Sequence, residues 1–146
     1  MGSRRKGREL ALQVLYLVDV TSFPKEKVQI SVLKNASLEK KSLDFFNTLI
    51  DGTLTHIDEL DRMIIQYSEN WEIKRMAAVD RNILRLGAYE LIYEIDTPIS
   101  VIIDEAVEIA KIYSTHDSGK FVNGILDKIK KKRKKEKHEQ IENAST

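Results

Sequence analysis

The stretch from Val79 to Glu94 constrains the fold most, because its apolar side chains point in nearly every direction around a helix. A surface helix shows one apolar stripe, whereas a helix that is apolar most of the way round is buried by its neighbours. Glycine is unfavourable in a helix interior, so we expect Gly87 to let another helix approach closely. The charged side chains of this helix must reach a surface, a partner or each other. They include Asp80, Arg81, Arg85 and Glu90.

The rest of the chain shows helical periodicity and no strand-like alternation, which predicts an all-α fold. We expect helices over about 4–20, from Pro24 to Asn35, and over about 38–68 as one long helix containing Gly52. Two more helices are expected after Pro98, with apolar faces at 102–113 and 122–129. From Lys130 the apolar face ends, so residues 131–146 are expected to be a disordered basic tail. The length of 146 residues suits one domain, or two small helical halves that share a core.

The net charge of +1 hides a segregation of charge along the chain. Residues 1–8 carry four bases and no acid, and residues 128–137 carry eight bases and one acid. Residues 9–127 hold 12 bases and 20 acids. Such segregation favours two kinds of partner, one polyanionic and one more basic.

The chain contains no cysteine, no apolar run long enough to span a membrane and no apolar segment of a secretion signal after its basic start. We therefore expect a cytoplasmic protein with no membrane partner. Gly119-Lys120 fails as a phosphate-binding loop, because position 114 is Ser and position 121 is Phe. The three histidines are too scattered to predict a metal site, and no catalytic group is recognisable. We expect neither an enzyme nor a cofactor.

Two segments carry residue types that suit a polyanion. Four bases lie in the first turns of the first helix, where they oppose the helix dipole unless an anion lies against them. They are Arg4, Arg5, Lys6 and Arg8. The second segment begins the last helix and offers a cation, an aromatic ring and an amide in Lys120, Phe121 and Asn123, which together suit single-stranded RNA. Two other interpretations stay open: the N-terminal bases can be a solvated terminus, and Phe121 can belong to the core.

Three motifs in the chain are distinctive: RRKGRELALQVLY, AVDRNILRLGAYELIYEIDTPISVIIDEAVEIAK and DSGKFVNGILDKI. In these motifs most strongly, and over nearly all of residues 4–130, the sequence resembles the NusB family of bacterial transcription antitermination factors. It implies about seven helices in two small bundles, at about 4–68 and 70–130, and no enzymatic activity. It also implies binding to the boxA element of nascent ribosomal RNA jointly with the ribosomal protein NusE, within a complex on RNA polymerase that suppresses termination.

The resemblance also assigns expected roles to individual residues. Arg4, Arg5, Lys6 and Arg8 would contact the RNA backbone, and Lys120, Phe121 and Asn123 would form a second RNA-facing segment. Asp117 would modulate that segment, because a carboxylate repels phosphates although it suits a helix N-terminus. Tyr16 and Asp80 would lie near the NusE surface. Two alternatives remain: a helical RNA-binding module like those of ribosomal RNA methyltransferases, and a scaffold that binds only proteins.

Overall fold

The regular structure of this chain consists of helices. The structure is a computed structural model that describes residues 2–69 and 72–145, with side chains described for residues 4–69 and 72–133. In chain order the helices are α1 (Gly2–Thr21), α2 (Lys25–Leu33), α3 (Lys40–Thr55), α4 (Ile57–Tyr67), the short 3-10 helix η1 (Ile73–Arg75), α5 (Ala78–Tyr93), α6 (Ile99–Tyr113) and α7 (His116–Ser145). The described residues contain no strand. The predicted all-α fold with about seven helices is therefore confirmed.

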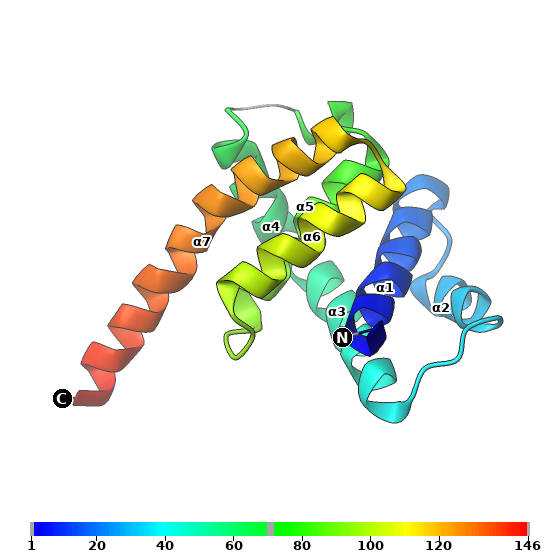
Figure 1. The fold of residues 1–146 in the computed structure, drawn as a ribbon, viewed down its shortest axis with the longest axis horizontal. Helices are drawn as coiled ribbons and strands as arrows, with labels where there is room; N and C mark the ends of the chain where they lie inside the picture. The colour runs from blue at the N-terminus through cyan, green and yellow to red at the C-terminus, as the bar shows by residue number, and fades with distance from the viewer. Residues whose placement is uncertain (1, 70–71, 146) are drawn as a thin grey trace.

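The helix α5 lies at the centre of the molecule, as its apolar composition predicts. Every residue from Asn82 to Ile92 is buried. In Figure 1, α1 and α2 lie to the right of α5, α7 runs along its upper left, and α6 passes in front of it. Gly87 permits the predicted close approach, because a Cβ atom there would stand 2.8 Å from Cδ1 of Leu126 in α7. The buried apolar residues form one continuous core.

The predicted long helix over 38–68 is wrong, because the chain breaks at His56 between α3 and α4. His56 has φ −105° and ψ 18°, and its ring stacks on that of Tyr93 with centroids 4.1 Å apart. Asp58 and Glu59 then occupy the first turn of α4, where acids favour a new helix start. The apolar spacing of three and four residues continues across the break, so periodicity alone could not reveal it.

The two predicted bundles remain a prediction, although the contacts assign α4 to the second group rather than the first. The helix α4 packs mainly on α5 and also contacts α7, and it touches α3 less extensively. The helices α1, α2 and α3 pack together, and α5 contacts both groups.

The disordered basic tail expected over residues 131–146 stays a prediction, although α7 (His116–Ser145) runs into that range. Arg133 is buried and donates hydrogen bonds to carbonyl oxygens at and after the end of α5, including those of Leu91 at 2.6 Å and Thr97 at 2.7 Å. A guanidinium that binds the free carbonyls of a helix C-terminus stabilises that end. Lysine-rich composition therefore masked one residue that fixes this part of α7 to the body.

Candidate nucleic-acid interface

The basic end of α1 presents Arg4 and Lys6 as exposed cations. The Arg4 guanidinium carbon lies 4.5 Å from the centre of the Phe45 ring, and Nη1 lies 3.5 Å from Oγ1 of Thr97, a weak hydrogen bond. Aromatic and hydroxyl contacts hold the Arg4 side chain while leaving it accessible to an external anion.

Arg5 is only partly available to an RNA phosphate, because its guanidinium forms an ion pair with the Glu105 carboxylate of α6. The Arg5 side chain is 34% exposed, and that of Glu105 is 16% exposed. The hydrogen bond to Glu105 raises the pKa of Arg5 above its usual value, against the opposing effect of burial. An RNA phosphate would have to share this guanidinium with Glu105.

Arg8 lies inside the protein, so the expectation that it contacts RNA is not supported. Its Nη2 atom lies 2.8 Å from Oε1 of Glu90 in α5, and both side chains are 3% exposed. Burial raises the pKa of Glu90, and the hydrogen bond and charge of Arg8 partly oppose that effect. A pair this deeply buried satisfies its own charges, and we assign Arg8 to the fold rather than to RNA.

The residues expected at the start of α7 lie on two sides of that helix. Lys120 and Asn123 are exposed and line a shallow pocket with Asp104 and Glu108 of α6. Phe121 is half-buried, packs on the core and lines a different pocket beside Met76. Phe121 therefore belongs in part to the core while one side of it lines a surface pocket.

Thr115, rather than Asp117, caps the N-terminus of α7. The backbone N–H of Ser118 donates to Oγ1 of Thr115 at 3.0 Å, which is the usual arrangement of a capping threonine. Asp117 is exposed in the first turn, where its charge suits the helix dipole. The sequence analysis did not identify this cap, although threonine is a preferred residue directly before a helix.

The predicted partner residues Asp80 and Tyr16 are both half-buried. Oδ2 of Asp80 accepts a hydrogen bond from Oγ of Ser118 at 3.0 Å, whereas Oδ1 is buried and has no hydrogen-bond partner among the described residues. Asp80 thus links α5 to the start of α7. The assignment of Asp80 and Tyr16 to a partner surface stays a prediction.

The helix α6 lies between the two cationic segments. Its Glu105 pairs with Arg5 of α1, and its Tyr113 hydroxyl donates to the Glu9 carboxylate of α1. That hydrogen bond and burial raise the pKa of Tyr113 to about 12. On its other side α6 packs against α7 and contributes Asp104 and Glu108 to the pocket that contains Lys120. The two segments therefore flank acidic residues of α6, which sequence reasoning did not assign to this surface.

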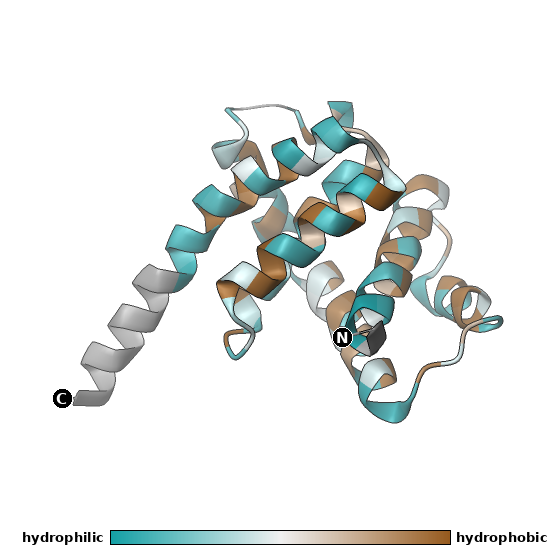
Figure 2. Ribbon diagram, viewed as in Figure 1, coloured by the Kyte–Doolittle hydropathy of each residue, from teal (hydrophilic) through white to brown (hydrophobic). Residues whose placement is uncertain are grey.

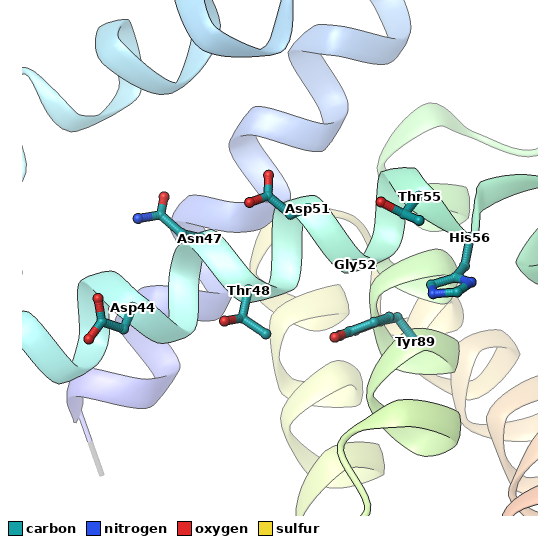
Figure 3. Close-up of a pocket in the computed structure, with 8 residues that line it drawn as sticks. All are labelled: Asp44, Asn47, Thr48, Asp51, Gly52, Thr55, His56 and Tyr89. Carbon is teal, nitrogen blue, oxygen red and sulfur yellow. The ribbon is translucent and has the colours of Figure 1, made fainter.

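A separate pocket lies along α3, shown in Figure 3, where Asp44 and Asp51 point away from the ribbon and Tyr89 of α5 extends beneath Gly52. A Cβ atom on Gly52 would stand 2.2 Å from the Tyr89 ring, so glycine is required for this close approach. Burial and the charge of Glu94 raise the pKa of Tyr89 to about 12. Asp51 is paired with Lys25 at 2.8 Å. These groups form no recognisable nucleophile and base pair.

Within the part of the chain whose side chains are described, no group of three or more His, Cys, Asp or Glu residues could hold a metal ion. Among the described residues, no helix is both long and apolar enough to cross a membrane.

The fold and this surface define a class: small all-helical proteins that present cations from two separate helix N-termini on either side of a third helix. The chain belongs to the NusB family, whose sequence profile matches residues 5–131. Transcription antitermination protein NusB of Elusimicrobium minutum is 44% identical over 136 residues, covering 92% of this chain and 97% of that protein. The NusB of Desulfatibacillum aliphaticivorans is 46% identical over 129 residues, covering 88% and 90%.

Two solved structures support the same assignment at the level of the fold. T. maritima NusB has a TM-score of 0.82 and 41% identity, covering 88% of this chain and 90% of that one. The NusB chain in a crystal structure of antitermination factors NusB and NusE in complex with dsRNA has a TM-score of 0.82 and 32% identity, covering 90% and 98%.

Proposed function

We propose that this chain is an RNA-binding transcription antitermination factor. With the ribosomal protein NusE it binds the boxA element of nascent ribosomal RNA transcripts, and the resulting complex helps RNA polymerase to resist termination. The observation that carries the proposal is the pair of exposed cationic segments, Arg4 and Lys6 on α1 and Lys120 on α7, that flank α6 in a member of the NusB family. A fold relative that was crystallised with NusE and dsRNA supports the choice of partners.

The chemistry of the surface favours phosphate contacts that position the RNA. Arg4 is held over Phe45 and can turn donors outward, and Lys6 and Lys120 are exposed point charges. Phe121 is half-buried and lines a surface pocket, and an aromatic ring is the group on which RNA bases stack. We assign no step of bond making or breaking to these residues.

The test is RNA binding by the full chain at several salt concentrations, with boxA-like RNA and a scrambled RNA, each with and without NusE. Each phosphate contact adds about 0.7 to the slope of log affinity against log salt for a single strand. Arg4→Gln/Lys6→Gln should flatten the slope by about 1.4. The control Lys27→Gln/Lys34→Gln removes the same charge from exposed positions around α2 and should leave the slope unchanged.

Circular dichroism should give the same helical signal for both double variants. Equal slopes for wild type and Arg4→Gln/Lys6→Gln would assign those bases to a solvated terminus. Binding to NusE with no affinity for either RNA would favour the scaffold alternative. Equal binding to boxA-like and scrambled RNA, unaffected by NusE, would favour a general RNA-binding module.

A further inference from the structure

Gly124 is a glycine in the interior of α7 that no neighbour among the described residues requires. A Cβ atom built on Gly124 would meet nothing within 4 Å, whereas the same construction at Gly52 and Gly87 meets side chains at 2.2 and 2.8 Å. Glycine is a poorer helix former than alanine, so an exposed glycine here weakens α7 without a packing reason. Close approach of another molecule's backbone would supply that reason.

Gly124 lies in the middle of a cationic face of α7. At 100° per residue, Lys120, Gly124, Lys128, Lys131 and Lys132 fall within about 120° of arc. All five residues are exposed. We call this face the α7 ridge. Figure 2 shows the described part of α7 coloured mainly as hydrophilic on the side towards the viewer.

The lysines of the α7 ridge have no ion-pair partner among the described side chains. The neighbouring Lys130 is not counted in the ridge, because its Nζ lies 2.6 Å from Oδ1 of Asp127 and its charge is paired. Asp117 lies on the same arc about one turn before Lys120, at the N-terminal end of the helix. The positive charge of the ridge therefore increases from its N-terminal end towards Lys132.

Arg133 holds the far end of the ridge in place. Its side chain is buried and donates to the carbonyl oxygens of Glu90, Leu91, Glu94 and Thr97. Thr97 also accepts the hydrogen bond from Arg4, so the region after α5 joins the basic end of α1 to this part of α7. Lys128, Lys131 and Lys132 are consequently presented from a helix that is fixed to the body.

We propose that the α7 ridge is a track for a single RNA strand that continues from the start of α7, with the strand's backbone passing closest to the helix at Gly124. This inference rests on the proposed RNA binding and extends its footprint. Lys120 and Lys132 are separated by 12 helical positions, or about 18 Å, roughly the rise of five stacked nucleotides. The ridge contributes phosphate contacts, whereas base recognition belongs to other residues.

The first arm of the test varies RNA length. A short boxA-like single-stranded RNA is compared with the same RNA lengthened by about five nucleotides at either end. The full-length wild type should bind the RNA lengthened at one end several-fold more tightly, with a salt slope steeper by about 1.4 from Lys131 and Lys132. Lys131→Gln/Lys132→Gln should lose that gain while binding the short RNA as wild type does. Lys27→Gln/Lys34→Gln is the matched control and should keep the gain.

The second arm tests the close approach at Gly124. Gly124→Gln places a side chain in open space, so the melting temperature should rise while affinity for the lengthened RNA falls about tenfold or more. The opposite signs separate this effect from misfolding. Gln66→Leu, an exposed substitution on α4, should leave RNA affinity unchanged.

Two outcomes overturn the track, and they differ from failure of the proposed function. If wild type binds the short RNA but gains nothing from either extension, or if Gly124→Gln and Lys131→Gln/Lys132→Gln both bind the lengthened RNA as wild type does, the track is wrong while RNA binding stands. If wild type binds neither RNA, with or without NusE, the proposed function and the track both fail.

Discussion

Arg4 and Arg8 lie one helical turn apart on α1, yet they meet opposite environments. The Arg4 side chain reaches the surface beside Phe45 and Thr97, whereas the Arg8 side chain is buried against Glu90. The sequence identified both as bases in a cationic segment, and nothing in their spacing distinguished them. The difference depends on Glu90, which lies 82 residues away in the chain. A cross-helix ion pair of this kind cannot be inferred from local pattern.

Removing the Arg8 charge should destabilise the fold far more than removing the Arg4 charge. Arg8→Met leaves the Glu90 carboxylate buried without its partner, and we expect the free energy of unfolding to fall by about 3–5 kcal/mol. Arg4→Met should change it by less than about 1 kcal/mol. Urea denaturation at neutral pH measures both. Arg8→Met/Glu90→Leu should recover most of the loss, and equal losses for the two single variants would contradict the assignment.

At the scale of helices, the sequence predicted those elements whose signal is local. The segment 79–94 is apolar most of the way round, so both its burial and the close contact at Gly87 were predictable. The break at His56 was not, because the apolar spacing continues through it. The anchoring of α7 by Arg133 was also missed, because a run of lysines conceals the one arginine that binds carbonyls at and after the end of α5. Tertiary contacts decided both features.

Arg133 should stabilise the end of α5 and the adjoining turn of α7 together. Burial lowers the pKa of Arg133 below its usual value, but a guanidinium remains charged at neutral pH. Arg133→Met removes charge-assisted hydrogen bonds to several carbonyls, and we expect a loss of about 1.5–3 kcal/mol in unfolding free energy. Lys132→Met at the exposed neighbouring position should cost less than about 0.5 kcal/mol. Hydrogen exchange at the C-terminal amides of α5 should accelerate only in Arg133→Met, and unchanged exchange there would refute the role.

At the scale of the whole molecule, ion pairs join the two groups of helices around α5. Oδ2 of Asp19 in α1 accepts hydrogen bonds from Arg81 at 2.6 Å and Asn82 at 2.9 Å, both in α5. Arg85 bridges Asp19 and Asp61 of α4, with Nε of Arg85 2.7 Å from Oδ1 of Asp61. The burial of this helix predicted that its charged side chains need partners, but the sequence could not show that those partners come from α1 and α4.

Asp19 should make the stability of the whole fold sensitive to acid. Burial opposes ionisation of this carboxyl, but the hydrogen bonds from Arg81 and Asn82 and the positive charges outweigh burial and hold its pKa below the usual value. A carboxyl with a lowered folded pKa stabilises the fold above its unfolded pKa of about 3.9, and that contribution is lost as pH falls through the lower folded pKa. Asp19→Asn keeps the side-chain shape and removes the charge, so it should be less stable than wild type at pH 7 by about 1–3 kcal/mol.

The difference between wild type and Asp19→Asn should narrow as pH falls below about 4, because wild type then loses the charge that the variant already lacks. Thermal unfolding from neutral to acidic pH measures this convergence. Asp51→Asn is the matched control, because the Asp51 side chain is 57% exposed and its ion pair with Lys25 lies at the surface. If the difference in stability between wild type and Asp19→Asn is the same at every pH, the amide destabilises the fold for steric reasons and not through the lost charge. If the stability difference from wild type narrows at low pH for Asp19→Asn and not for Asp51→Asn, the charge of Asp19 is the link between α1 and α5.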